Sequence, residues 1–487
     1  MNKNKFYITN AIPYVNAKPH IGHAMEFVQS DTIARFHKQM GEEVLLLCGA
    51  DENAIKNVQA AEQEKITIQE LVDKNSKLFE DLAKKLNVGF DVFQRGSSKK
   101  HHISSQKLWE LCYKDGDIYK KQYTGLYCVG CELFYEKNEL SEKGECFEHP
   151  GKKLEEVSEE NYFFKLSKYQ KELEEILKSN KIRIVPQNRR NEALSFIRDG
   201  LKDISISRSN IRAKNWGVTV PNDKEQKVYV WFDALNIYQS GVGFGSALQN
   251  DDKKYKEWWP ADLHVIGKGI LRFHAIYWPA FLLSAGLPLP KSIFVHEYIT
   301  VNGQKMSKTL GNVTDPIELI DKYGSDPLRY YILRYISPFT DGDFSHKKFK
   351  EIYNADLANG LGNLIARVAK LCENSSYMQM GSQDRASGHL ISIEEYSNAM
   401  SEFRFNDALF FVWKKIAALD KFINDEKPWN LLKEGDRRLK PILAHSIDQI
   451  QEIAALLEPF LPETSQKIEE QFKVPKIGSQ PSLFPRI

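Results

Sequence analysis

Two histidines three residues apart are the first residues in this sequence that could carry chemistry. In the segment NAKPHIGH, His20 and His23 stand on either side of Gly22. Side chains at positions i and i+3 share one face of a helix, and the first helical turn offers free N–H groups to an anion. Gly22 would let a ligand approach the backbone without meeting a Cβ atom. The pattern predicts a phosphate-binding site with two ring N–H donors, and an amphipathic helix with two surface histidines is the alternative.

A second candidate for phosphate binding lies far along the chain. In NGQKMSKTLGN, residues 302–312, Lys305 and Lys308 flank Met306 and Ser307 between two glycines. Lysine ammonium groups on such a loop can neutralise the charge of a leaving pyrophosphate. Taken alone, the segment KMSKT is also typical of a solvated basic turn.

Three of the 6 cysteines lie near a histidine at spacings that suit a metal ion. Cys128 and Cys131 form a C-x2-C pair, and Cys146 and His149 follow as a C-x2-H pair after 14 intervening residues. Four such ligands predict tetrahedral Zn²⁺ in a structural role, because no position is left open for water. A redox disulfide between Cys128 and Cys131 is the alternative, and it leaves the other pair unexplained. The remaining cysteines are expected to be buried: Cys48, Cys112 and Cys372.

The histidine pair lies where a strand is expected to give way to a helix. Residues 5–10 alternate and favour a strand, residues 20–40 carry apolar side chains at helical spacing, and EEVLLLCGADE is typical of a buried parallel strand. These segments predict a βαβ unit, in which ligands gather at the carboxyl ends of the strands. Residues 64–114 are expected to be helical.

The rest of the chain predicts an interrupted α/β fold followed by a helical bundle. A turn-rich insertion begins at YKKQYTGLYCVGC, and strand-like segments resume at KVYVWFDAL, ADLHVIGKG and SIFVHEYITVNGQKMS. From Phe344 to Phe460, apolar residues recur every three or four positions, which predicts helices. The expected division is a parallel sheet in residues 1–115 and 226–343, an insertion with a zinc knuckle in residues 116–225, and an all-α domain in residues 344–487.

Composition excludes few classes of function. The 487 residues carry 67 Lys and Arg against 65 Asp and Glu, a net charge of +2, so any nucleic-acid contact must be local. The length predicts roughly two to four domains. No apolar run approaches the ~18–20 residues of a membrane span, and the N-terminus lacks a signal segment. We therefore expect a soluble cytoplasmic protein.

The histidine and lysine segments together give the chain a family resemblance. With H-I-G-H and K-M-S-K-T in this order, the chain resembles the class I aminoacyl-tRNA synthetases over nearly its whole length. The segments VWFDALNIY and GKGILRFHAIYWPAFL between them resemble pocket segments of the methionyl-tRNA synthetases, and CVGC with CFEH resembles their single-knuckle members. The resemblance implies an α/β fold: a class I Rossmann-type catalytic domain split by a zinc-bearing connective insertion, followed by an all-α anticodon-binding bundle.

By motif position, the resemblance implies three sets of binding residues. ATP, with Mg²⁺ on its phosphates, would meet His20, Gly22, His23, Lys305, Met306, Ser307 and Lys308, of which the histidines and lysines would be catalytic. Methionine would be held by Ile12, Tyr14, Trp231, Ala234, Leu235, Tyr238, Ile270, His274 and Trp278, with Asp51 receiving its ammonium group. Anticodon bases would be read by Asn363, Arg367 and Trp429.

The chemistry of these residues suits the implied ligands. A flexible thioether is held well by apolar and aromatic walls, a carboxylate pairs with an ammonium group, and unstacked bases lie on aromatic rings. For any one of these residues taken alone, ordinary core packing is the alternative.

The implied reaction has two steps. The L-methionine carboxylate attacks the α-phosphorus of ATP, pyrophosphate leaves, and the terminal ribose of tRNA(Met) then takes the methionyl group. Neither step needs a protein nucleophile, so catalysis would rest on positioning and charge stabilisation. One alternative is a synthetase for another amino acid, such as cysteine, whose pocket would want metal ligands. The other is a non-catalytic zinc-knuckle RNA-binding protein. The chain ends soon after the expected bundle, which predicts a monomer.

The sequence departs from the family pattern at four places, one of them a pair of adjacent residues. GADENA places Asn53 and Ala54 where histidine and glycine are common. The family pattern therefore does not predict the secondary contacts around Asp51, although the carboxylate itself is kept. Gly269 replaces a frequent aspartate near the ATP ribose, and no ribose role is assigned there. The other two departures are Leu235 for a frequent proline and Thr309 for serine.

Overall fold

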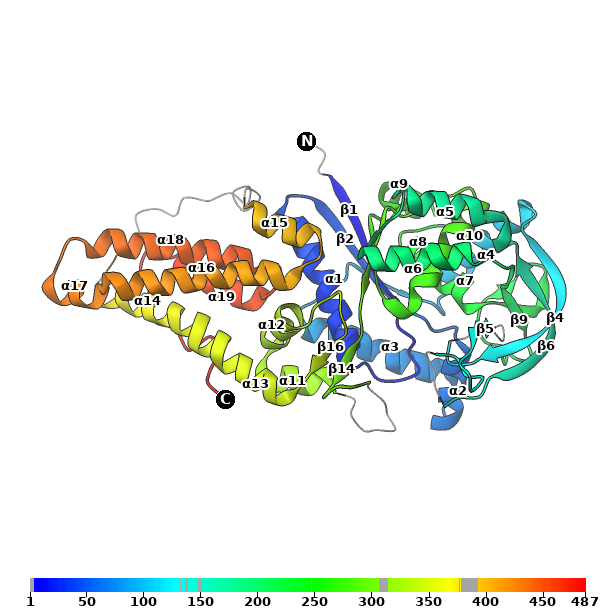
Figure 1. Cartoon of the computed structure of the whole chain (residues 1–487), viewed down its shortest axis with the longest axis horizontal. Helices are drawn as coiled ribbons and strands as arrows, with labels where there is room; N and C mark the ends of the chain where they lie inside the picture. Colours follow the sequence, from blue (N-terminus) through cyan, green and yellow to red (C-terminus); the bar gives the residue numbers. More distant parts are fainter. Residues whose placement is uncertain are drawn as a thin grey trace.

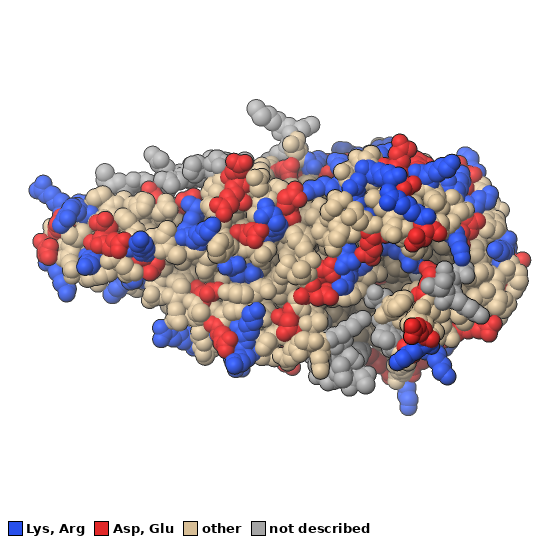
Figure 2. Space-filling view, viewed as in Figure 1, with Lys and Arg blue, Asp and Glu red and all other residues tan. Residues whose placement is uncertain are grey.

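The computed structural model describes residues 4–131, 133–135, 139–147, 151–246, 248–305, 314–375, 377 and 393–487, with the backbone alone at 133 and 305. The molecule is elongated, with a sheet and its insertion at one end and a helical bundle at the other (Figure 1). Lys and Arg alternate with Asp and Glu over the face drawn in Figure 2, as the small net charge predicts. Within the described residues, no helix is both long and apolar enough to span a membrane.

A parallel sheet of 6 strands, in the order β3-β2-β1-β12-β13-β7, forms the centre of the α/β half of the molecule. All its neighbours pair in parallel. The strands are β1 (Lys5–Asn10), β2 (Glu43–Ala50), β3 (Val92–Arg95), β7 (Arg183–Val185), β12 (Leu263–Gly267) and β13 (Ser292–His296). The strand order reverses between β1 and β12, and ligands of such sheets bind in the crevice beyond the carboxyl ends at that point.

The predicted βαβ unit at the N-terminus is confirmed. Helix α1 (Ile21–Gln39) joins β1 to β2, and β2 is buried over its last six residues. The expectation of continuous helix over 64–114 is wrong at β3, which separates α3 from α4. A strand of only 4 residues is too short to leave a periodic pattern. The helices here are α2 (Ile55–Glu64), α3 (Ile68–Lys85) and α4 (Lys99–Lys114).

The insertion is built on an antiparallel sheet of 4 strands in the order β5-β4-β6-β8. A smaller sheet of 3 strands, β10-β11-β9, lies beside it. The strands are β4 (Ile118–Cys128), β5 (Leu133–Tyr135), β6 (Glu155–Phe164), β8 (Ile204–Ser205), β9 (Ser207–Ser209), β10 (Thr219–Val220) and β11 (Asp223–Val228), and the helices are α5 (Gln170–Lys178) and α6 (Gln187–Arg198). Strand β7, from the same stretch of chain, is an edge strand of the main sheet.

The expected strand through VWFDAL is wrong. Residues Val230–Leu235 form a short buried helix, α7, because an apolar run of this length suits a buried helix as well as a buried strand. The following helices are α8 (Ile237–Ser240), α9 (Gln249–Trp258) and α10 (Trp278–Ser284), with a π-helical turn at Phe273–Tyr277.

The lysine segment and the bundle follow β13. A small sheet contains β14 (Ile299–Val301), β15 (Gln304–Lys305) and β16 (Gly342–Phe344), with the first two helices of the helical part between β15 and β16. The helices are α11 (Pro316–Tyr323), α12 (Ser325–Tyr335), α13 (His346–Ile352), α14 (Asn363–Asn374), α15 (Glu394–Ser401), α16 (Phe405–Glu426), α17 (Pro428–Glu434), α18 (Leu439–Leu457) and α19 (Pro462–Phe472), with a π-helical stretch at Tyr353–Gly362. One apolar core runs from α1 and α3 into this bundle, and a second lies on the other face of the sheet, towards the insertion.

Candidate active site

The histidine pair begins helix α1 at the carboxyl end of β1. His20 is the residue before the helix, and its Nδ1 accepts a hydrogen bond of 3.1 Å from the Gly22 amide. His23 makes the reciprocal contact: its Nδ1 accepts a hydrogen bond of 3.1 Å from the His20 amide. The two rings lie with their centroids 3.9 Å apart. The two side chains therefore hold the helix start in the manner of a capping box.

These contacts fix which ring nitrogen can act on a ligand. A neutral imidazole that accepts at Nδ1 carries its proton at Nε2, so both histidines keep an Nε2–H donor. Burial and the neighbouring His20 hold the pKa of His23 well below its usual value of 6.5, so this ring is neutral at pH 7. The sequence expectation of free backbone N–H groups is wrong: the Ile21 amide donates to the Thr314 carbonyl at 3.3 Å, and the Gly22 amide donates to His20.

The chain that follows the lysine segment lies beside this helix start. Strands β14 and β15 form a hairpin whose turn is Asn302-Gly303, both with positive φ, a favoured two-residue turn. The side chain of Lys305 and residues 306–313 lie outside the described residues, and with them the predicted Met306, Ser307, Lys308 and Thr309. The chain resumes at Thr314, which bonds to Ile21. The described chain after the segment is thus joined to the start of the histidine helix.

A small pocket lies between β1, α7, α8 and the segment after β12. Every residue that lines it was expected at the methionine side chain: Ile12, Trp231, Ala234, Leu235, Tyr238, Ile270 and His274. Leu235, the departure from proline, is therefore a wall residue. Trp231 stacks on Phe273 with ring centroids 3.7 Å apart, and this stacking gives the pocket a flat aromatic side.

Two of the lining residues form a polar pair at the pocket. The His274 Nδ1–H donates to the Ile270 carbonyl at 3.0 Å, so Nε2 is the acceptor for the Tyr238 hydroxyl at 2.7 Å. Burial lowers the pKa of His274 to about 4. The pair is therefore neutral at pH 7, and the pocket suits an uncharged side chain.

Asp51 lies directly after β2, next to Tyr14 in a parallel bridge. Its amide donates to the Pro13 carbonyl at 2.9 Å, and its side chain is in a buried position. Tyr14 meets Trp231 edge to face, with ring centroids 6.0 Å apart, so the backbone of Asp51 is one residue removed from a pocket wall. Trp278 is placed differently: it is fully buried against Trp259 and is not among the residues that line the pocket.

The three described residues of the metal knuckle converge. Their sulfur atoms lie within 4.8 Å of one another, with Cys131 and Cys146 3.8 Å apart and Cys128 and Cys146 3.2 Å apart. Tetrahedral Zn²⁺ with Zn–S bonds of about 2.3 Å requires sulfurs about 3.8 Å apart, so this group could hold a metal ion and is consistent with zinc. All six cysteines are free thiols, and His149 lies outside the described residues.

The knuckle also contacts the pocket. The Trp231 indole N–H donates to the Cys131 carbonyl at 3.2 Å. The Lys56 ammonium donates to the Gly130 carbonyl at 3.1 Å and lies 3.1 Å from the centroid of the Tyr14 ring. The insertion therefore supports two aromatic residues beside Asp51.

The predicted anticodon residues lie at the far end of the bundle. Asn363 is exposed at the start of α14, and Trp429 is half-buried in α17, which packs against α14. Arg367 is held by Asp420 at 2.8 Å and by Asn424 at 3.2 Å. All three lie in the helical half of the molecule, away from the sheet (Figure 1).

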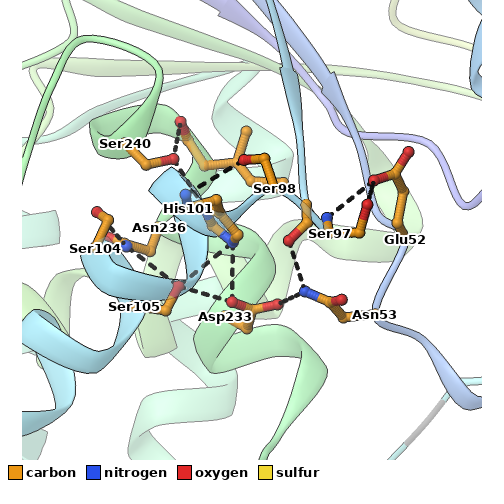
Figure 3. A network of polar contacts seen from close by, with 12 residues as sticks. Glu52, Asn53, Ser97, Ser98, His101, Ser104, Ser105, Asp233, Asn236 and Ser240 are labelled. Carbon is orange, nitrogen blue, oxygen red and sulfur yellow. Dashed lines mark hydrogen bonds and ion pairs between the residues drawn. The ribbon is translucent and has the colours of Figure 1, made fainter. Parts of the chain in front are cut away.

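A buried polar network beside the pocket was missed on the sequence (Figure 3). Asp233 of α7 accepts hydrogen bonds from Asn53 and Ser105 and is paired with His101. The sequence did contain a signal for this network: Asp233 lies inside the apolar segment VWFDAL, and a buried carboxylate needs hydrogen-bonding partners. The partners themselves lie too far away in the sequence to be identified from it. Phe273 was also missed, although it adjoins His274.

The comparisons with known proteins agree with this site. Residues 6–369 match the family described as "tRNA synthetases class I (M)". The methionine–tRNA ligase of Brucella suis biovar 1 is 40% identical over 486 residues, which cover 98% of this chain and 93% of the relative. That of Thermotoga maritima is 41% identical over 475 residues, 95% of this chain and 74% of the relative.

Solved structures give the same result. The methionyl-tRNA synthetase of Mycobacterium tuberculosis in complex with methionyl-adenylate has a TM-score of 0.91 and 35% identity, with 99% of this chain and 100% of that chain covered. Its apo form has a TM-score of 0.82 and 33% identity, with 100% and 98% covered. Sequence and fold agree over almost the whole length, and the chain belongs to the methionyl-tRNA synthetase family of class I aminoacyl-tRNA ligases.

Proposed function

We propose that this chain joins methionine to tRNA(Met) in two steps at the crevice between β1 and β12. In the first step, a carboxylate oxygen of methionine forms a bond to the α-phosphorus of ATP, and the bond to pyrophosphate breaks. In the second step, a hydroxyl of the terminal tRNA ribose attacks the carbonyl carbon, and AMP leaves. Reaction by displacement at phosphorus and carbonyl needs placement and charge neutralisation more than a protein nucleophile.

The roles follow from the chemistry of each group. The Nε2–H groups of His20 and His23 donate to phosphate oxygens as negative charge moves towards the leaving pyrophosphate. Lys305 and Lys308 supply positive charge to that pyrophosphate, and Mg²⁺ would neutralise the phosphates of ATP. Asp51 binds the methionine ammonium group.

The observation that supports this function best is the pocket itself, because every lining residue was expected from the family motifs. Its walls are apolar and aromatic, and its one polar pair is neutral. A pocket for cysteine with a bound metal would need thiolates, imidazoles or carboxylates free to coordinate, and His274 already uses both ring nitrogens.

The test is exchange of labelled pyrophosphate into ATP with each amino acid supplied alone. We expect exchange only with methionine, and the addition of tRNA(Met) should then yield methionyl-tRNA. Exchange that is strongest with another amino acid would contradict the substrate, and absence of exchange with all of them would favour a non-catalytic RNA-binding protein.

We further propose that Cys128, Cys131, Cys146 and His149 hold one structural Zn²⁺, which would tie β4 to the turn that carries Cys146. Purified protein should contain one equivalent of zinc by mass spectrometry of the metal, and Cys131→Ser should lose most of it. The matched control is Cys112→Ser, a buried cysteine outside the knuckle, which should keep the metal. Equal zinc content in both variants would contradict the site.

The helical half would bind the anticodon through Asn363, Arg367 and Trp429, the first two by hydrogen bonds to base edges and the last by stacking. A monomer is expected in solution, and light scattering coupled to gel filtration measures the mass directly. A mass twice that of the chain would contradict this expectation.

A further inference from the structure

Asp233, in helix α7, is a buried carboxylate with three polar partners. Asp233 is buried, and both of its carboxylate oxygens are occupied. Oδ1 accepts from the Ser105 hydroxyl at 2.7 Å and lies 2.9 Å from His101 Nε2, while Oδ2 accepts from Asn53 Nδ2 at 2.6 Å. Burial raises the pKa of Asp233, but the nearby His101 outweighs this and leaves the pKa below its usual value. The group therefore stays a carboxylate inside an apolar segment.

The two sides of this network belong to different parts of the methionine site. Asp233 lies between Trp231 and Ala234, which line the pocket. Asn53 lies two residues after Asp51, on the loop that follows β2, and its Nδ2 also donates to the Gly96 carbonyl at 2.9 Å. The Asn53–Asp233 hydrogen bond thus joins the pocket wall to the loop of the ammonium-binding carboxylate (Figure 3).

Helix α4 also takes part in this polar network, through His101 and Ser104. His101 is fully buried, and its Nδ1 lies 2.8 Å from the hydroxyl of Ser240, at the end of α8. Ser104, on the same helix, accepts from Asn236 Nδ2 at 2.9 Å, just before α8. Since α8 carries the wall residue Tyr238, α4 holds both wall helices by buried polar contacts.

The loop of Asp51 is itself fixed from the side opposite Asp233. Glu52 is fully buried and accepts from the Ser97 amide at 2.9 Å and the Ser76 hydroxyl at 2.6 Å, and it pairs with Arg95. The Trp216 indole N–H donates to the Glu52 carbonyl at 2.7 Å. These contacts hold the loop that carries Asp51 in place. If a change at Asp233 shifts α7, the loop does not move with it, and the distance between the pocket wall and the Asp51 carboxylate changes.

We propose that Asn53, His101 and Asp233 are positioning residues that hold α7 and α8 in register with Asp51 and so set the affinity for methionine. Buried ionic groups contribute little to stability compared with apolar residues of the same shape, which leaves specificity of arrangement as their use. The proposal rests on the proposed function of the pocket. Asn53, one of the departures from the family pattern, is thereby given a contact: its amide serves as the donor to Asp233.

The first test is Asp233→Asn, which keeps the shape and removes the charge. We expect the KM for methionine in pyrophosphate exchange to rise at least 10-fold, while the KM for ATP changes less than 2-fold. Ser105→Ala removes the hydroxyl that donates to Asp233 and also contacts His101 and Asn236, but it leaves the carboxylate in place. It should raise the methionine KM about 3-fold, and it tests the proposal even if Asp233→Asn does not fold.

The matched control is Asp117→Asn. Asp117 is also a buried carboxylate, bonded to Lys168 at 2.8 Å and Ser284 at 2.9 Å, and neither partner lines the pocket. We expect Asp117→Asn to lose about as much thermal stability as Asp233→Asn and to keep the KM for methionine unchanged. If Asp233→Asn and Ser105→Ala behave like this control, the positioning role is wrong.

A pair of changes tests the contact itself. Asn53→Asp places two carboxylates at the Asn53–Asp233 contact and should raise the methionine KM strongly. Adding Asp233→Asn restores one amide–carboxylate pair, so the double variant should bind methionine better than Asn53→Asp alone. Additive losses would overturn the inference. Absence of methionine-dependent exchange in the unaltered protein would instead overturn the proposed function, so the two failures are distinguishable.

Discussion

The histidines of α1 use their two nitrogens for separate tasks. Nδ1 of His20 and of His23 accepts from a backbone amide at the helix start. We expect Nε2–H to be the donor to a ligand. The sequence predicted the two residues as donors to phosphate but did not predict this division, because it took the backbone amides to be free. The division allows the two tasks to be separated by mutation.

His20→Asn should separate them. Asparagine is a good residue at this helix position, so the hydrogen bond from the Gly22 amide and the thermal stability should be kept, while the Nε2–H donor is lost. We expect the exchange kcat to fall about 10²–10³-fold, as for other single donors to developing charge. His20→Ala should lose about 1 kcal/mol of stability as well. A stable His20→Asn protein with unchanged exchange would contradict the donor role.

His274 gives the protein a defined sensitivity to acid. Its pKa is about 4 in the folded state and 6.5 by reference, so between these pH values the unfolded chain binds the extra proton. Stability from this residue is therefore present above pH 6.5 and is lost as pH falls towards 4, by about 2 kcal/mol at pH 5. His274→Gln should be less sensitive to a change from pH 7 to pH 5 in urea denaturation, by that amount.

The matched control for this prediction is His346→Gln, which changes an exposed histidine. It should retain the full acid sensitivity of the unaltered protein. If His274→Gln also retains the full acid sensitivity, the low pKa of His274 is not the cause of that sensitivity.

At the scale of elements, the sequence predicts those with a long periodic pattern. Helix α1 and strand β2 are 19 and 8 residues long, and both were expected close to their observed bounds. Helix α7, of 6 residues, was taken for a strand, and β3, of 4 residues, was taken for helix. Short buried elements are decided by what packs around them, which a local pattern does not contain.

The same limit applies to the site. The residues that line the pocket could be predicted because they belong to three short segments, each continuous in the sequence. The partners of Asp233 could not be, since Asn53 is 180 residues away and Ser105 is 128 residues away. Contacts of this kind depend on how the sheet brings distant segments together.

Helix α17 carries the element-scale prediction about tRNA. Trp429→Ala should leave methionine-dependent exchange within 2-fold, because the bundle end lies away from the sheet. Stacking of a base on an aromatic ring contributes about 1–3 kcal/mol, so kcat/KM for charging should fall roughly 5- to 150-fold. Trp429→Phe should retain most of the charging. Equal losses of exchange and charging would contradict the anticodon role.

At the scale of the whole molecule, one buried arginine joins its halves. Arg329 of α12 is fully buried, pairs with Asp31 of α1 at 2.8 Å, and donates to the Phe460 carbonyl at 2.7 Å and the Pro459 carbonyl at 2.9 Å. Asp31 also pairs with Arg35 at 2.7 Å. Helix α1, which begins at the histidine pair, is thus linked to the turn between α18 and α19.

Arg329→Met should weaken this junction. Removing one partner from a buried ionic group costs about 3–5 kcal/mol, and the remaining carbonyls lose their donor. Thermal denaturation followed by calorimetry should show a lower transition for the bundle. Arg198→Met, which removes an exposed pair with Glu174, should change stability by less than about 1 kcal/mol. Similar effects of the two variants would contradict the structural role of Arg329.

The strand order also determines when the site can exist during synthesis. Strand β1 lies at the centre of the sheet, and its Tyr7 amide bonds to Asp262, 255 residues later. A ribosome that adds about 5–20 residues per second needs roughly 13–50 s to reach that partner. Until then β1 can pair only with β2, and its other edge stays open to unwanted strands. The crevice that would hold ATP therefore depends on a strand partner that is synthesised late, and a chaperone that covers the open edge of β1 would protect the growing chain during this interval.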